Sequence, residues 1–456
     1  MRNTFGSMPT QFAARMQVEG SIVTVTFGMI RFHLATVDRQ IPPSTNHVTP
    51  FAIPRSEGAL VPRRQPRFGY AEAVMRRVCG VICVVFSAIL LSAQPPLHFD
   101  RQVLATDLAG GYQVIPCDVN GDGKPDLIAL ASGMTDLVWF ENPTWERHVM
   151  ASHLSHMINA ACWARAPHSI PTVAVAYEFS MNPQESLGIV SLLAAGADPR
   201  KPWKVSEIDR LPTSHRLRWA RVDSSGDKVL VNAPLADSHA HGPDYRGHVP
   251  LVYYRPGEWK RRLIGDQEEG ILHGIFVTDW DRNGRDALLI GSFLGIHLYQ
   301  FRPDGEWLRT EIAQGSPKPW PKSGTSDITV GRCANERFLA AIEPWHGNEV
   351  VVYRGGGAPW RREVIDDSLL DAHTVQTADL DGDGCDEIVA GFRGQPYGVY
   401  IYHWDGARWR RQILDQGGVS AASCAIVDTQ GNGRLDIACI GSATHNLVLY
   451  RNSKVL

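Results

Sequence analysis

The sequence has no excess of charge of either sign: 45 lysines and arginines stand against 48 aspartates and glutamates in 456 residues. A surface that binds nucleic acid or an anionic membrane normally carries a basic excess. The charge balance therefore argues against either as the main partner, and we expect the protein to bind no nucleic acid.

Motifs of several enzyme classes are also missing. The chain has no Gly-x-Ser-x-Gly nucleophile elbow, no HExxH zinc motif and no phosphate-binding loop. What the composition does hold is 42 glycines, 29 prolines and 13 tryptophans. This combination is typical of many short strands joined by tight turns.

Residues 75–93 have the pattern of a secretory signal peptide. Two arginines precede an apolar stretch, residues 78–91, which ends in the small residues Ser92 and Ala93. The stretch is shorter than the about 20 residues that span a bilayer. We therefore predict a secreted or periplasmic protein with no stable membrane span after cleavage. An uncleaved anchor is the alternative.

The folded part is expected to cover residues 94–456. Translation would start at Met75, and residues 1–74 would be a non-native or disordered extension without a folding pattern. Six cysteines follow the signal peptide, and none has CxxC or CxxxC spacing, so a zinc knuckle is not expected. In an exported protein some could pair, most plausibly Cys424 with Cys439. Isolated buried thiols are the alternative.

A signature of tryptophan, a basic residue and then an aliphatic residue recurs along the chain. Successive copies are 48 to 58 residues apart, and each follows a strand of alternating apolar residues. Such a period is typical of a repeated structural unit. The copies begin at Trp145, Trp203, Trp259, Trp307, Trp360 and Trp409.

A second signature precedes these copies: an apolar strand, a polar turn rich in Gly and Asp, and another apolar strand. It occurs seven times, clearly in four places and weakly in three, within residues 115–132, 161–178, 220–234, 277–292, 330–344, 377–391 and 426–441. Each unit therefore reads as four antiparallel strands, the size of a propeller blade.

The count of outer strands predicts how the ring closes. Seven inner hairpins are followed by six tryptophan-type outer strands, and a matching segment, residues 99–104, lies before the first hairpin. Pairing this N-terminal strand with the last blade would remove both sheet edges. We predict an all-β fold, a seven-bladed β-propeller of four-stranded antiparallel blades; an open solenoid is the alternative.

The Asp-rich loops between apolar strands resemble FG-GAP or VCBS repeats over residues 97–452. More narrowly, the segments His215-Arg-Leu-Arg-Trp219, His273-Gly-Ile and Trp280-Asp-Arg-Asn-Gly are similar to the propeller domain of fungal aldos-2-ulose dehydratases. The resemblance implies a propeller fold and β-elimination on keto-sugars. The cupin and lectin-like domains of the fungal enzymes have no room in this chain.

Two of the loops have the pattern of a calcium site. Alternate oxygen side chains can converge on a hard cation, and a glycine at the sixth position permits the bend. We predict structural Ca²⁺ in both, with a metal-free turn as the alternative. Loops 279–287 and 428–436 have lost carboxylates, and we expect no tight metal there. The predicted ligands are Asp118, Asn120, Asp122 and Asp126, and Asp379, Asp381, Asp383 and Glu387.

The first strands of the blades are expected to begin around one channel mouth, opposite the Asp-rich loops. The position six residues before each loop is histidine in several blades, and Thr325 and Ala422 in two others. We predict that these side chains form one functional ring around the channel mouth. The alternative is that the histidines only form hydrogen bonds within a narrow channel. Connections between second and third strands should reach the same end, with His346 and Arg393 among them. The candidate site residues are Tyr112, His156, His215, His273, His373 and Arg218.

Clustered imidazoles beside Tyr and Arg suit proton abstraction next to a carbonyl and loss of a hydroxyl. His215 or His156 would be the base and Arg218 the stabiliser of the enolate, although alternation along a strand turns Arg218 away from His215. The others would serve as acids or as ligands of a divalent metal. We predict a carbohydrate-active lyase or dehydratase with a keto-sugar or related saccharide as substrate. The alternative is a non-catalytic module that binds an extracellular glycan or protein.

Overall fold

The computed structural model describes residues 13–18, 21–26, 96–355 and 359–453. The chain forms two compact units, Met1–Arg77 and Val78–Leu456. In the first, β1 (Ala13–Val18) pairs antiparallel with β2 (Ser21–Thr26), within the segment predicted to have no folding pattern. The predicted signal peptide, residues 75–93, lies outside the described residues.

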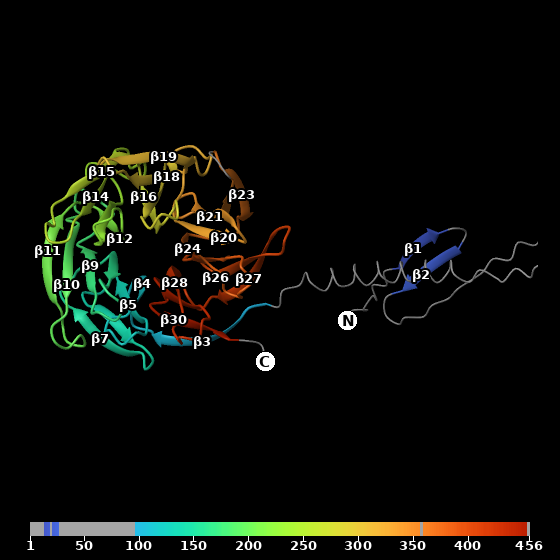
Figure 1. The fold of residues 1–456 in the computed structure, drawn as a ribbon, viewed down its shortest axis with the longest axis horizontal. Helices are drawn as coiled ribbons and strands as arrows, with labels where there is room; N and C mark the ends of the chain where they lie inside the picture. Colours follow the sequence, from blue (N-terminus) through green and yellow to red (C-terminus); the bar gives the residue numbers. More distant parts are fainter. Residues whose placement is uncertain (1–12, 19–20, 27–95, 356–358, 454–456) are drawn as a thin grey trace, which may run out of the picture. The chain divides into compact units, whose positions relative to one another are not determined.

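The second unit is a ring of seven four-stranded antiparallel sheets, as predicted (Figure 1). The first four blades comprise β4 (Gly111–Cys117), β5 (Asp126–Ala131), β6 (Leu137–Glu141) and β7 (Glu146–Ala151); β8 (Asn159–Trp163), β9 (Thr172–Tyr177), β10 (Ile189–Ala194) and β11 (Lys204–Arg210); β12 (Ser214–Ala220), β13 (Val229–Pro234), β14 (His248–Tyr254) and β15 (Arg262–Glu269); and β16 (Leu272–Thr278), β17 (Ala287–Ser292), β18 (Gly295–Phe301) and β19 (Trp307–Ala313).

The last three blades complete the ring. They comprise β20 (Ile328–Cys333), β21 (Glu336–Glu343), β22 (Glu349–Arg354) and β23 (Arg361–Asp366); β24 (Ala372–Ala378), β25 (Glu387–Phe392), β26 (Gly398–Trp404) and β27 (Trp409–Gln416); and β28 (Ala421–Val427), β29 (Asp436–Gly441), β30 (Leu447–Ser453) and β3 (His98–Ala105).

The N-terminal strand β3 closes the ring by pairing antiparallel with β30, which confirms the predicted closure. In Figure 1 the cyan β3 lies beside the red β30. Second strands such as β5 and β29 are buried along their whole length. Both of their faces meet neighbouring blades, which explains why their sequences are continuously apolar.

Apolar clusters fill each space between neighbouring blades. Within the described residues, one such cluster joins each of the seven adjacent pairs, including blades 7 and 1. The blades therefore depend on their neighbours for burial, as repeats of this kind do.

The basic residue of the tryptophan signature forms an ion pair near the outer edge of the ring. In blade 4, the carboxylate of Glu268, from blade 3, accepts bonds from Tyr299 Oη (2.8 Å) and Arg309 Nε (2.9 Å). Burial alone would raise the pKa of Glu268, but His297 and the bonds from Ser292 and Arg309 lower it to about 2. Similar Tyr–carboxylate–Arg groups are Tyr254–Asp209–Arg261, Tyr353–Glu343–Arg362, Tyr402–Asp366–Arg411 and Tyr450–Asp415–Arg101.

The six cysteines between residues 96 and 453 of the described structure all form disulfides. Cys424–Cys439, the predicted pair, lies within blade 7. Cys117–Cys162 joins blades 1 and 2, and Cys333–Cys385 joins blades 5 and 6. The part of the chain that the structure describes has no helix with the length and apolar character of a membrane span.

Replacing Arg309 with alanine should lower the free energy of unfolding by about 1–3 kcal/mol, because a buried carboxylate loses its charged partner. Urea denaturation would measure the change. Arg302→Ala, which breaks an exposed pair with Asp304, is the control and should cost at most about 1 kcal/mol. Equal losses in the two variants would contradict a special role of the buried pair.

Candidate functional site

A β-bulge near the start of the first strand recurs in five blades. The register shifts there across Tyr112, His215, His273, His373 and Ala422. A bulge adds one residue to a strand and re-aims its side chain. Residues far apart in the sequence are therefore brought together at the end of the ring where the first strands begin.

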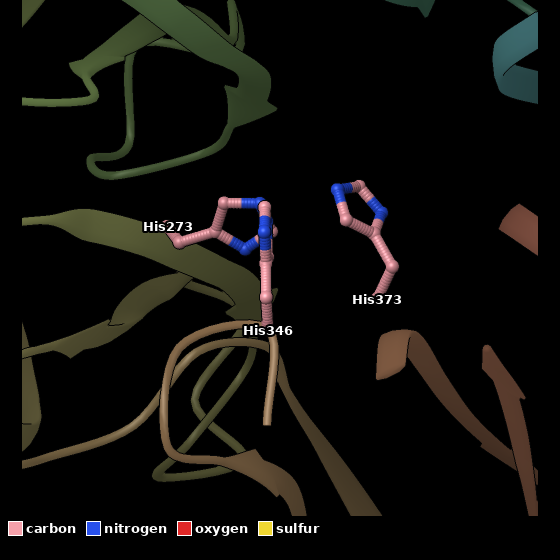
Figure 2. Close-up of side chains that lie close together, drawn as sticks. All are labelled: His273, His346 and His373. Carbon is pink, nitrogen blue, oxygen red and sulfur yellow. The ribbon is translucent and has the colours of Figure 1, made fainter. Parts of the chain in front are cut away.

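Four histidine rings lie together at this point. His273 is central: its ring centroid lies 5.1 Å from that of His215, 5.2 Å from that of His346 and 4.9 Å from that of His373. Figure 2 shows three of these side chains turned toward one another. His215, His273 and His373 are buried, whereas His346, from the loop between β21 and β22, is partly exposed.

A chain of hydrogen bonds connects His215 to His373 through a tyrosine. Tyr112 Oη lies 2.9 Å from His215 Nε2 and 3.4 Å from His373 Nε2. His373 Nδ1 donates to the carbonyl oxygen of Ala422 (2.5 Å), so its Nε2 carries a lone pair. If Tyr112 donates to His373 and accepts from His215, every atom in the chain is bonded except His215 Nδ1, which is enclosed and without a partner.

Arginines fix the other two histidines. Arg216 Nη2 lies 3.1 Å from His273 Nε2, and its Nε donates to the His273 carbonyl oxygen (3.1 Å). The other ring nitrogen of His273 lies 3.3 Å from Ser326 Oγ. Since a guanidinium only donates, His273 Nε2 accepts and its Nδ1 carries the proton.

His346 also holds an unpaired donor. Arg393 Nη2 lies 3.2 Å from His346 Nδ1 and also bonds to Asp371. Neutral His346 therefore carries its proton on Nε2, an enclosed atom without a hydrogen-bond partner. The cluster thus holds one unpartnered ring nitrogen, Nδ1 of His215, and one unused N–H, on His346.

Burial and neighbouring guanidinium groups keep the four imidazoles uncharged. Burial is the larger cause, and it lowers the pKa of each histidine well below 6.5, with Arg216 or Arg393 adding to the effect. Burial also raises the pKa of Tyr112 above 10, so its hydroxyl stays protonated. A neutral imidazole has one ring nitrogen without a proton, and this nitrogen can act as a general base.

The cluster borders a cavity of about 570 Å³. The ring of Phe179 lies 5.4 Å from that of His215, and the ring of Trp345 lies 4.6 Å from that of His346. Convergent polar groups between aromatic walls are typical of a small-molecule site. Besides the aromatic residues, the lining includes Tyr112, His156, His215, His273, His346 and Arg393.

The structure separates the predicted residues into three groups. Tyr112, His215, His273 and His373 come together as expected, and His156 lies at the exposed rim of the cavity. Arg218 instead lines a second cavity of about 230 Å³ with Asp327 and His373. Its Nη1 donates to the Leu217 carbonyl oxygen, and burial lowers its pKa to about 10.

Sequence analysis gave no role to Arg216 and placed His346 and Arg393 on this face without assigning them to the site. Alternation along a strand puts Arg216 on the side opposite to its neighbour His215. The bulge removes this alternation, and no sequence pattern located the bulge. For His346, the signal was its place in a connection between second and third strands, which is where the structure has it.

The histidine cluster fits a metal ion poorly in its present arrangement. Ligand atoms of His273, His346 and His373 lie within 4.8 Å of one another. However, two guanidinium groups occupy ring nitrogens of His273 and His346, and a backbone carbonyl holds His373. An ion would have to displace cations from its own ligands, so we derive no step through a metal here.

The Asp-rich loops lie at the opposite ends of the first strands. In blade 1, Asp118 and Asn120 accept backbone N–H groups of the turn, while Asp126 accepts those of Val119 and Asn142. Burial raises the pKa of Asp126 to about 7. In blade 6, carboxylate oxygens of Asp379, Asp381 and Asp383 lie within 4.8 Å of one another. Calcium in these loops stays a prediction.

Parts of the chain match two protein families. Residues 188–355 match the family of the aldos-2-ulose dehydratase β-propeller domain, and residues 379–439 match the FG-GAP-like repeat. Aldos-2-ulose dehydratase from Phanerodontia chrysosporium is 26% identical over 239 residues, which cover 45% of this chain and 26% of that protein. The matched region is thus about a quarter of that relative's length. The predicted resemblance is confirmed.

Solved structures with a similar chain trace include BBS1N from two crystals of its complex with ARL6DN, soaked with mercury and with lead. The TM-scores are 0.49 and 0.47 at 13% identity. In both, the match covers 79% of this chain and 97% of the other.

Acid should destabilise the protein through these histidines. Their pKa values are lowered in the folded state, so the neutral histidines contribute fully to the free energy of unfolding above pH 6.5. This contribution is lost as the pH falls below 6.5. Each histidine should add about 1.4 kcal/mol per pH unit to the slope of the free energy of unfolding against pH. Urea denaturation between pH 5 and 6.5 should show a slope smaller by about this amount in His373→Gln. The exposed His239→Gln is the control, and an unchanged slope in His373→Gln would contradict the assignment.

Proposed function

We propose that this protein is an exported carbohydrate-active lyase that performs β-elimination on a keto-sugar or a related saccharide in the histidine cavity. The observation that carries the proposal is the pair of unpartnered ring nitrogens on two histidines that line the cavity, Nδ1 of His215 and Nε2 of His346. The similarity to aldos-2-ulose dehydratase supports the reaction class and the saccharide substrate.

His215 is the general base of this proposal. A neutral imidazole with a free Nδ1 can take the proton from the carbon next to the substrate carbonyl. The positive charge that forms on His215 is then shared through its Nε2–H with Tyr112, which bonds onward to His373. This chain orients the base and gives its second nitrogen a partner in both protonation states.

The enolate oxygen receives its stabilisation from donors that are already in place. His346 Nε2–H points a hydrogen bond at the developing negative charge, and Arg393, bonded to the other nitrogen of His346, reinforces it. Arg216 adds a second buried positive charge behind His273. Since these groups are fixed before substrate binds, little reorganisation is needed during the reaction.

His215 takes one proton from the substrate and returns the same proton later in the reaction. The C–H bond beside the carbonyl breaks and its proton passes to Nδ1. The C–O bond at the next carbon then breaks as a carbon–carbon double bond forms. His215 returns the proton to the leaving oxygen, which departs as water from a free hydroxyl or as an alcohol from a glycosidic bond. No oxidant or other co-reactant is required.

Export and calcium complete the proposal. Three disulfides are typical of proteins in oxidising compartments, which supports a secreted or periplasmic location. The Asp-rich loops of blades 1 and 6 would hold structural Ca²⁺ away from the cavity, with oxygen ligands from alternate loop positions.

Incubation with keto-sugars such as anhydrofructose should produce an enone, which is followed by its ultraviolet absorbance. His215→Gln should lower kcat by about 10²–10⁴-fold through loss of the base. His346→Ala should lower it by about 10²–10³-fold through loss of the enolate donor. The control His239→Gln should retain full activity. Absence of turnover with every keto-sugar, together with glycan binding, would favour the non-catalytic module instead.

Calcium should stabilise the protein after treatment with a chelator. At 100 times the dissociation constant, one bound ion adds about 2.7 kcal/mol to the free energy of unfolding. A rise in Tm on adding Ca²⁺ would measure it, and Asp118→Asn should remove part of the rise. Asp279→Asn, in the blade 4 loop that lacks a carboxylate at position nine, is the matched control. A Tm that does not respond to Ca²⁺ would contradict calcium in the loops.

A further inference from the structure

A group of three side chains with metal-binding atoms lies at the other end of blade 6 from the histidine cavity. Asp381 belongs to the loop between β24 and β25, Glu387 begins β25, and His403 lies on β26. One ligand atom of each lies within 4.8 Å of those of the other two. Glu387 is 1% exposed, and the His403 side chain is 13% exposed. Three separate segments thus bring two carboxylates and one imidazole to one point.

Gln412 determines which nitrogen of His403 carries a proton. The Gln412 amide is oriented by Leu97, whose N–H it accepts at 3.1 Å and to whose carbonyl oxygen it donates at 2.7 Å. The same Gln412 oxygen lies 3.1 Å from His403 Nε2, which must therefore be the donor. This leaves His403 Nδ1 as the nitrogen that faces the carboxylates, and it is enclosed without a hydrogen-bond partner.

The separation of the ligand atoms matches a shared cation better than a direct bond. His403 Nδ1 lies 3.6 Å from Glu387 Oε1, which is too long for a hydrogen bond. Two ligands of a tetrahedral ion, each at about 2.0–2.1 Å, are about 3.4 Å apart. A lone pair that faces two carboxylates is repulsive, and either a proton on Nδ1 or a metal ion between the three groups would relieve the repulsion.

Other blades fill the equivalent position with a different partner. Strand register aligns His403 with Glu141 in blade 1 and with Gln300 in blade 4. Glu141 accepts a bond from Asn120 and pairs with Arg200, and Gln300 donates to Asp281 at 2.6 Å. In blades 1 and 4, the third loop residue thus already has a hydrogen-bond partner on the third strand. In blade 6, the third loop residue is Asp381, and the group on the third strand that faces it is the imidazole of His403.

We propose that Asp381, Glu387 and His403 bind a divalent transition-metal ion of the zinc type, with water in the remaining position. Imidazole suits zinc and cobalt, whereas calcium takes oxygen ligands. Gln412 is the outer partner that orients the ligating histidine, as is common at zinc sites. Asp379 and Asp383, which form a separate oxygen-only group with Asp381, are the residues suited to calcium.

Metal titration of the full-length protein after chelation tests this site. Co²⁺ reports nitrogen and oxygen ligation by its visible absorption, and calorimetry gives the affinity for Zn²⁺. His403→Gln should weaken Zn²⁺ binding by at least about tenfold and leave Ca²⁺ binding unchanged. Glutamine is the residue that blade 4 has at this position, so the substitution copies a contact already present in the fold.

Two further variants make the result decisive. The titration is repeated in the His373→Gln background, so that binding in the histidine cavity cannot be mistaken for this site. Gln412→Ala, which frees the His403 ring while retaining all three ligands, should weaken Zn²⁺ binding by about 10–100-fold. Equal Zn²⁺ affinity with and without His403, or no Zn²⁺ bound in the His373→Gln protein at micromolar concentration, would overturn the proposal.

Discussion

Pairing of the two ends of the domain is the constraint on which the rest of the structure depends. The N-terminal strand β3 completes blade 7, and the apolar cluster beyond it continues without a break from blade 7 into blade 1. Without this pair the last blade would expose a sheet edge, and the ring would be free to open. Closure forces all seven first strands to begin around one axis. Residues separated by 261 positions, Tyr112 and His373, can then share a hydrogen bond.

The chemistry of the cavity follows from how charge is arranged beside that axis. Arg216 and Arg393 donate to imidazole nitrogens, and Arg393 is also neutralised by Asp371. A buried cation next to an imidazole opposes its protonation and so lowers its pKa. The arginines therefore keep the histidines neutral and at the same time place positive charge beside the cavity. In the reaction that we propose, one set of contacts would supply both the base and the electrostatic stabiliser.

The repeat pattern was enough to predict the fold, because each blade repeats the same order of apolar strands, polar turns and outer tryptophans. It also predicted the closing strand and the convergence of Tyr112, His215, His273 and His373. Arg216 was not assigned because bulge positions depend on backbone pairing, which no residue pattern marked. The role of the arginine in the tryptophan signature was equally hidden, since its carboxylate partner in blades 3, 4 and 6 belongs to the preceding blade. Contacts between blades are the part of the structure that a repeat period does not specify.

The bulged position can hold different residues in different blades, so the ring can carry a site without any change in the structure of its blades. Blade 7 has the same bulge, but its residue is Ala422, whose carbonyl oxygen, rather than its side chain, holds His373. The position thus serves through side chains in four blades and through the backbone in a fifth. The outer Tyr–carboxylate–Arg groups do not involve it, and of the bulged residues only Tyr112 packs against the apolar clusters between blades. A related propeller could exchange the bulged residues and keep its fold, so the proposed activity depends on these side chains and not on the ring.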